Sequence, residues 1–443
     1  MMWRVTNVQI RNARQVAPPI SSSTTTEAER GAWLGRVEAL VGSSHLDPSH
    51  PLAILLGRRH WFDMLELHTL GACMARLAER QPRELDAIAR KVLDRDENNA
   101  RGAAFEILAA GLFHHDTYNP VDLPSDPHQP GFDFSVRLPR GTLRISCKAR
   151  VKSERERRFL AMSETFFRRA ADGLHPRSHS IAGLFWKQLP AHDRLLDEEL
   201  AVFRQALGDR ERGGIGQRRT PNGLVLVKPW PKFENLSFWK KLASFSLTTA
   251  MEHHRNEQVR VRDPVADAIA KFRKHNVPLG PTDLWAIAIK LPGAIRWVKA
   301  REILLQELQT APEVSAIWAV RPRVVSTNAQ ATAFNYYVEF LDLENPYARY
   351  PVRDIMRDDA PFVVSSPTSR IERAEFTLVL DGGIEPPMPI TESYAWEQSR
   401  RFFYVGNPGT ASYSAAPNST TYFVDARDDG VILHGPPSEP CLV

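Results

Sequence analysis

Two stretches in which apolar and polar residues alternate strictly predict a β-hairpin in the first half of the chain. Residues 132–137 alternate, and so do residues 143–148, with the sequence Leu138-Pro-Arg-Gly141 between them. A period of two is typical of a half-buried strand, and proline and glycine mark the turn. Because alternate side chains share one face of a strand, Ser146 and Lys148 point the same way, and the hairpin brings Asp133 close to Lys148.

A helical pattern precedes the hairpin. Between residues 98 and 113, apolar residues recur at steps of three and four, and Glu106 stands among them. A buried carboxylate is costly unless it is paired, metal-bound or protonated, so Glu106 lies at the rim of the helix or meets a cation. Similar patterns over residues 27–97 predict an N-terminal helical region, whose first helix begins at a capping box of Thr24 and Glu27.

The pattern after the hairpin predicts a larger α/β region. We expect helices over residues 155–169, 193–207 and 295–309, and a basic loop over 208–221. Short apolar runs predict strands at residues 224–228, 284–289, 314–320 and 334–342. Because a helix separates the second run from the third, these two strands are expected to be parallel. We therefore expect the sheet that begins at Asp133 to continue to about residue 345.

Length and composition suggest more than one domain. From the 443 residues we expect a helical region (1–97), an α/β domain (98–345) and a β-rich C-terminal extension (346–443). The three cysteines lack the CxxC spacing of a zinc site or the density of a disulfide scaffold, which fits a reducing, cytoplasmic compartment. No apolar run reaches the ~20 residues of a membrane span, and no signal peptide is predicted.

Basic residues are concentrated around the hairpin. The net charge of +5 permits nucleic-acid binding without requiring it, but lysine and arginine far outnumber acids between residues 137 and 158. We expect Arg144, Arg150, Lys152 and Arg155 to contact phosphate groups. The alternative is an ordinary solvated surface at the start of a helix.

An acid and a lysine at adjacent strand ends suit a divalent cation beside a phosphate group. The acid binds a hard cation through oxygen, and the lysine meets a phosphate oxygen or the attacking water. Glu106 on a helix, Asp133 on a strand and Lys148 at the end of the next strand resemble the core of the PD-(D/E)xK, or restriction-endonuclease-like, nuclease superfamily. The resemblance covers residues 98–170.

This resemblance implies a mixed sheet flanked by helices and the hydrolysis of phosphodiester bonds in DNA with Mg²⁺ or Mn²⁺. Asp133, Glu106 and the backbone carbonyl of Cys147 would hold the ion, and Lys148 would orient or deprotonate the attacking water. A role in restriction or phage defence is implied by the resemblance alone.

One position departs from the superfamily pattern. Ser146 stands where Asp or Glu is usual, so the resemblance implies a hydrogen-bonding role for Ser146 and a migrated carboxylate in the following helix, at Glu164. A first alternative is an inactive nuclease-fold subunit that binds nucleic acid or assembles with a protein partner or a second copy of the chain. A second is an unrelated α/β protein in which Glu106 lies far from Asp133.

Overall fold

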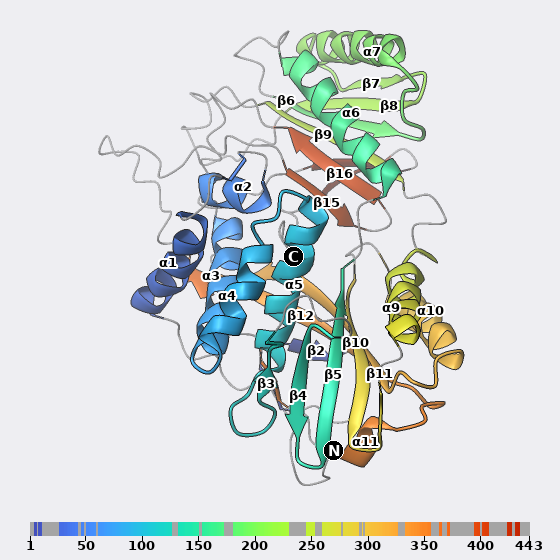
Figure 1. Cartoon of the computed structure of the whole chain (residues 1–443). Helices are drawn as coiled ribbons and strands as arrows, with labels where there is room; N and C mark the ends of the chain where they lie inside the picture. The colour runs from blue at the N-terminus through green and yellow to red at the C-terminus, as the bar shows by residue number, and fades with distance from the viewer. Residues whose placement is uncertain are drawn as a thin grey trace.

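The fold is described from a computed structural model of the chain. The described residues are 4–6, 8–10, 26–42, 46–47, 50–58, 61–125, 132–149, 153–171, 180–229, 245–252, 259–275, 278–291, 295, 297–326, 333–355, 363–365, 370–372, 394–398, 401–406, 423–427 and 430–434. Within them the protein is an α/β protein with an N-terminal helical region and two mixed sheets (Figure 1).

The first sheet has eight strands in the part of the chain described. Its order is β14-β12-β11-β10-β5-β4-β3, and β2 pairs with β12. The strands are β2 (Val8–Ile10), β3 (Val121–Asp122), β4 (Phe134–Leu138), β5 (Gly141–Lys148), β10 (Asp283–Lys290), β11 (Ala316–Ser326), β12 (Ala333–Glu344) and β14 (Arg370–Glu372). The predicted hairpin is confirmed as the antiparallel pair of β4 and β5. The predicted parallel pair is confirmed in β10 and β11, which α10 (Trp297–Gln309) connects.

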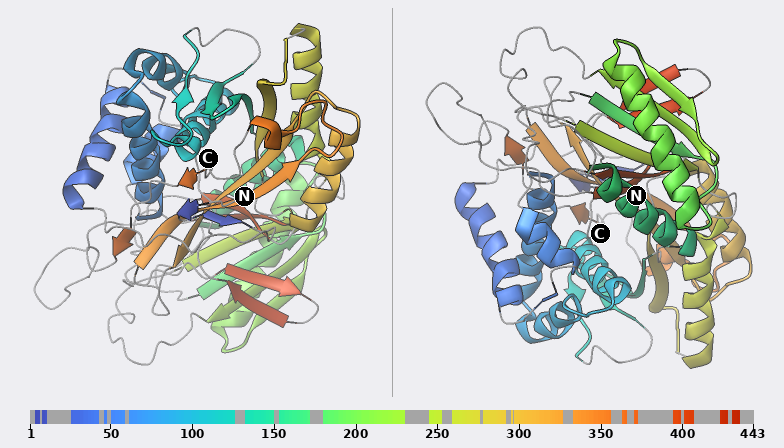
Figure 2. Two further views of the ribbon diagram at one scale, coloured as in Figure 1. Left: turned by 90° about the horizontal axis from the view of Figure 1, so that it is seen from below. Right: turned by 90° about the horizontal axis from the view of Figure 1, so that it is seen from above.

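Helices cover both faces of this sheet (Figure 2). On one side lie α1 (Glu27–Gly42), α2 (Pro51–Arg58), α3 (Trp61–Ala78), α4 (Pro82–Lys91) and α5 (Glu97–Phe113), whose apolar residues share one core with β4, β5 and β10. On the other side α9 (Arg262–His275) and α10 form a second core with β10, β11 and β12. There the ring of Trp285 stacks on Phe272 with the centroids 3.9 Å apart.

The helical N-terminal region follows the sequence prediction except at its start. The side chains of Thr26 and Glu29, rather than those of Thr24 and Glu27, make the capping box of α1. Glu29 accepts a bond from the Thr26 backbone N–H at 2.8 Å, and the Glu29 N–H donates to the Thr26 hydroxyl at 3.2 Å. The two boxes are both allowed by the threonine-rich sequence, and residue 24 lies outside the described residues.

The second sheet has six described strands, in the order β15-β16-β9-β6-β8-β7. They are β6 (Ser180–Trp186), β7 (Gly216–Arg219), β8 (Gly223–Pro229), β9 (Phe245–Glu252), β15 (Tyr394–Gln398) and β16 (Arg401–Gly406). The helices α6 (Glu154–Ala171) and α7 (Asp193–Glu211) supply the other half of its core. The remaining elements are α11 (Val352–Ile355) and the pairs β1 (Arg4–Thr6) with β13 (Val363–Ser365) and β17 (Phe423–Arg427) with β18 (Gly430–His434).

The second sheet corrects two expectations. The strand predicted at residues 224–228 is β8, which pairs with β6 and β7 and does not continue the first sheet. Residues 208–221 hold the end of α7 and the strand β7 rather than a loop. Gly216 is required there, because a Cβ atom would lie 1.9 Å from the backbone oxygen of Ala206 in α7. Strands after residue 345 pair in both sheets, as β14 and β16 show.

Candidate functional site

The helix α5 carries Glu106 against the first sheet. Asp96 caps this helix by accepting bonds from the N–H groups of Asn98 and Asn99, at 2.9 and 3.0 Å. Small residues let α5 lie close to its neighbours, and at Gly111 a Cβ atom would meet Cys73 of α3 at 2.6 Å. Glu106 is the one acid in the apolar middle of α5, and its side chain is 18% exposed.

The hairpin holds Asp133 at the end of the sheet next to Lys148. The backbone N–H of Asp133 donates to the oxygen of Ile145 at 2.8 Å, which sets Asp133 just before β4. Its carboxylate accepts a bond from the backbone N–H of Cys147 at 2.5 Å. Lys148 is the last residue of β5, beside Ile289 of β10, so this end of the sheet presents both an acid and a lysine. It is the end of β5 that faces the second sheet (Figure 1).

Electrostatics show that Glu106, Asp133 and Lys148 are neighbours. The pKa of Glu106 is raised to about 8, mainly by burial and then by the Asp133 carboxylate, while Lys91 and Lys148 partly offset the shift. Burial also raises the pKa of Asp133, against the opposing effects of Lys148, of the Cys147 N–H and of Lys91. The structure therefore brings the helix acid, the strand acid and the strand lysine within electrostatic reach of one another. Buried, mutually repelling carboxylates are typical of functional sites.

Lys91 is part of this cluster and was not identified from the sequence. It is the last residue of α4, and its Nζ lies 4.0 Å from Oε2 of Glu106. In the sequence it follows Arg90 at the end of an amphipathic helix, where a lysine is ordinarily solvated. Only the packing of α4 against α5 directs it to Glu106, and no local pattern reports that packing.

Ser146 lies beneath the site rather than in it. Its hydroxyl accepts a bond from the indole N–H of Trp285 at 3.0 Å, and the residue is buried. Ser146 thus joins β5 to β10, which agrees with a supporting role for its hydrogen bond. The thiol of Cys147 is also buried, and burial together with the charges of Asp133 and Glu106 raises its pKa well above the ordinary value. A thiol that stays protonated leaves the backbone carbonyl as the ligand that Cys147 offers.

The structure places the predicted migrated acid elsewhere. Glu164 lies on α6, which packs against the second sheet, and its exposed side chain pairs with Arg168 at 3.4 Å. Of the other two acids at the start of that helix, Glu156 accepts a bond from the backbone N–H of Ser153, and Glu154 pairs with Arg157. Across the described ranges, no group of three or more His, Cys, Asp and Glu side chains could hold a metal ion.

Two carboxylates and one carbonyl still fit a hard divalent ion. Mg²⁺ commonly keeps several waters and is held by one or two carboxylates together with substrate phosphates. The donor set of Glu106, Asp133 and the Cys147 carbonyl is all oxygen, and burial, the main cause of the raised pKa values, disfavours the charged forms of both acids. A divalent cation would stabilise those charged forms.

Two of the four residues predicted to bind phosphate, Arg144 and Arg155, are bonded to other parts of the protein. The guanidinium of Arg144 makes two bonds to Asp283, one of them at 2.6 Å, and lies 4.6 Å from the ring centroid of Phe132. Arg144 thus braces β5 against β10 and is engaged before any ligand arrives. Arg155 donates to the backbone oxygen of Glu252 at 3.3 Å. Arg150 and Lys152 lie outside the described residues.

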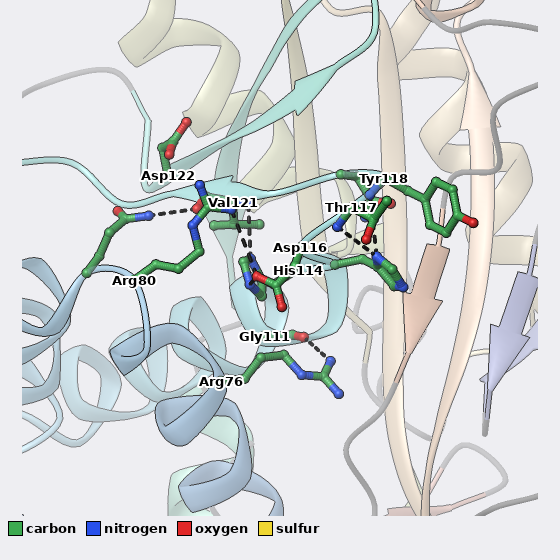
Figure 3. Close-up of polar contacts among 12 residues, drawn as sticks. Arg76, Arg80, Gly111, His114, Asp116, Thr117, Tyr118, Val121 and Asp122 are labelled. Carbon is green, nitrogen blue, oxygen red and sulfur yellow. Dashed lines mark hydrogen bonds and ion pairs between the residues drawn. The ribbon is translucent and has the colours of Figure 1, made fainter.

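The loop that begins at His114 follows the end of α5, and its polar side chains form hydrogen bonds within the fold (Figure 3). Nδ1 of His114 accepts a bond from the Val121 N–H at 3.1 Å, so the proton is on Nε2, which donates to Asp116 at 3.0 Å. Arg80 lies 3.9 Å from the same carboxylate. Nearby, Arg76 donates to the backbone oxygen of Gly111 at 2.8 Å, which caps the end of α5. Both ring nitrogens of His114 are occupied by the fold.

Comparison with protein-family models, with curated proteins and with solved structures found no match. Within the described residues, no helix is both long enough and apolar enough to cross a membrane.

Proposed function

We propose that the chain is a divalent-metal-dependent nuclease that hydrolyses phosphodiester bonds in DNA, with a site of the PD-(D/E)xK kind. One observation carries the proposal: Glu106, Asp133 and Lys148 come from three separate segments and meet at one end of the first sheet. A cytoplasmic role in restriction or phage defence belongs to the same proposal and rests on the resemblance alone.

Each residue of the cluster has a distinct task in this proposal. Asp133 and Glu106 hold the ion together with the Cys147 carbonyl, and the Cys147 N–H fixes the Asp133 carboxylate in place. A bound divalent ion polarises the phosphodiester and lowers the pKa of a coordinated water. Lys148 binds a non-bridging phosphate oxygen and orients the attacking water, so that negative charge developing on the phosphate meets a fixed ammonium.

The test is cleavage of plasmid and linear DNA in Mg²⁺ or Mn²⁺. We expect Asp133→Asn and Lys148→Met each to lower the cleavage rate at least about 100-fold. Asp263→Asn and Lys299→Met change the same residue types on exposed helix positions and should leave the rate unchanged. Thermal unfolding of all four variants checks that they fold. Undiminished cleavage by the Asp133→Asn, Lys148→Met double variant would contradict the proposal.

A second candidate function is that of a nuclease-fold subunit that binds DNA without cutting it. The observation in its favour is that a serine stands at position 146 and that Glu164 pairs with Arg168 on α6, so neither position adds a third carboxylate to Glu106 and Asp133. This candidate predicts DNA binding that weakens steeply with added salt, with no Mg²⁺-dependent cleavage. The same cleavage assay, run beside a binding titration at two salt concentrations, separates the two functions.

A further inference from the structure

Lys91 gives the proposed site a second ammonium group. It reaches Glu106 from α4, with 4.0 Å between Nζ and Oε2, and its side chain is 31% exposed. Its charge also acts on Asp133. Lys148 approaches the same two acids from β5, so two carboxylates face two ammonium groups contributed by different elements.

A second divalent ion would need ligands that the described residues do not offer at this place. The hydroxyl of Ser146 accepts a hydrogen bond from Trp285. The exposed side chain of Glu164 on α6 pairs with Arg168. With Lys91 and Lys148 already beside the two acids, one divalent ion gives the site more positive than negative charge, which disfavours a second ion. A further cation at Glu106 would have to share the Oε2 atom with the ammonium group of Lys91, which lies 4.0 Å from it.

We propose that Lys91 stands in for a second divalent cation, so that the site binds a single ion. The inference rests on the proposed nuclease function, because it requires a divalent ion at Asp133 and Glu106. It assigns to Lys91 a positioning role: its ammonium holds the outer oxygen of Glu106 and leaves the other oxygen to the ion. It also competes electrostatically with that ion, since two positive charges then share one carboxylate.

The test is a titration of the whole protein with Mn²⁺ in the absence of DNA, with free Mn²⁺ followed by electron paramagnetic resonance. We expect the wild-type chain to bind one Mn²⁺, and Asp133→Asn to lose it. Lys91→Gln removes the competing charge and should bind the ion about tenfold more tightly. Lys91→Arg keeps the charge and should bind like the wild type.

The matched control is Arg90→Gln, which removes the same charge from an exposed residue one position earlier in α4. It should leave Mn²⁺ binding unchanged. Thermal unfolding verifies that each variant folds, and Lys91→Met serves as a second neutral variant.

The outcomes separate this inference from the function on which it rests. If wild type binds one Mn²⁺ that Asp133→Asn abolishes, yet both neutral Lys91 variants bind it with unchanged affinity, the role of Lys91 is refuted and the nuclease proposal stands. Two Mn²⁺ ions in the wild type, both lost in Asp133→Asn, have the same consequence. If the wild type binds no Mn²⁺, or if Asp133→Asn binds it as well as the wild type does, both proposals fall.

Discussion

The two sheets are built alike but treat charge differently. Each has parallel strands at its centre, β5 with β10 in the first and β6 with β9 in the second, and each is covered by helices with a continuous apolar core. The first gathers buried acids at a strand end, and their pKa values are raised. In the second, a hydrogen bond from the partly exposed Arg218 side chain lowers the pKa of Asp209.

A fully buried acid provides a second comparison. It belongs to the second unit, by which we mean the second sheet with α6 and α7. Glu199 on α7 is inaccessible to solvent, but its Oε1 accepts bonds from the backbone N–H and the side-chain amide of Asn222, at 2.9 and 3.0 Å. It therefore serves the fold. Glu106 instead faces another acid, and the Nζ atom of Lys91 lies 4.0 Å from its Oε2. Burial alone therefore does not distinguish the two acids; what sets Glu106 apart is the like charge of Asp133 beside it.

The largest expected effect is a loss of stability when Trp285 is removed, because this residue packs against β5 and α9 next to the candidate site. Trp285→Ala removes a fully buried indole that stacks on Phe272 and donates to Ser146, and should lower the free energy of unfolding by about 3–5 kcal/mol. Trp186→Ala, in the core of the second sheet, should cost a similar amount. Urea unfolding followed by circular dichroism measures both. A loss below about 1 kcal/mol for Trp285→Ala would contradict the packing described.

The next effect is a pH dependence of the free energy of unfolding. It is expected in the first unit, which consists of the first sheet and the helices that cover it. Burial, with a smaller contribution from Arg30, lowers the pKa of His68 on α3 to about 4. Between pH 6.5 and about 4 the unfolded chain therefore binds a proton that the folded chain does not. The corresponding stability, about 3 kcal/mol, is present above pH 6.5 and is lost as the pH falls to 4.

Hydrogen exchange locates this acid effect. On acidification from pH 7 to pH 4.5 we expect α3 to lose protection, after correction for intrinsic rates, before α6 and α7 do. His68→Gln should reduce the difference, and His275→Gln, an exposed histidine at the end of α9, should not. Equal loss of protection in both units would break the comparison.

A smaller effect, of opposite sign, is expected at Glu106. Its pKa in the folded protein is about 8, above the ordinary 4.5, so its stabilising contribution is complete below pH 4.5 and is lost as the pH rises to about 8. Glu106→Gln should therefore stabilise the metal-free protein at pH 8 and have little effect at pH 4.5. Thermal unfolding at both pH values measures this. Glu199→Gln should destabilise instead, because an amide accepts the Asn222 bonds less strongly.

The smallest effect is expected at the surface of the second unit. Asp209→Asn removes the partner of Arg212 and Arg218, which are both bonded to it at 2.6 Å. Because all three groups are accessible to water, water and salt screen the interaction, and the unfolding midpoint should shift only slightly. Raising the salt concentration should abolish even this difference between variant and wild type. A large loss of stability that does not depend on salt would contradict this prediction. It would show that the interaction between Asp209 and its arginines is shielded from water.

The sequence predicted those elements whose signal is local. Strict alternation identified β4 and β5, and helical spacing identified α5, α6, α7 and α10. The acids and the lysine of the site were predictable because each ends or interrupts such a pattern. The strands β6 and β9 were not predicted, because a glycine interrupts the apolar run of β6 and the polar residues of β9 follow neither a continuous nor an alternating pattern.

Tertiary contacts account for the rest. Arg144 was expected to bind phosphate, yet its partner Asp283 lies 139 residues further along the chain. The assignment of β8 to a second sheet depends on β6 and β9, which come from separate segments. Lys91 joins the site only through the contact between two helices. Single-sequence patterns carry no record of such pairings, so they predicted the groups of the site better than their surroundings.

The bond between Arg155 and Glu252 shows how the chain passes between the two sheets. β5 and β10 are neighbouring parallel strands, although α6 and β6–β9 lie between them in the sequence. Arg155 belongs to the segment where the chain leaves for the second sheet, Glu252 to the end of β9 where it returns, and the bond holds these two points together. The second sheet is completed by β15 and β16, which follow the strands of the first sheet in the sequence. The two sheets are therefore interleaved along the chain, and each depends on the other for the course of its strands.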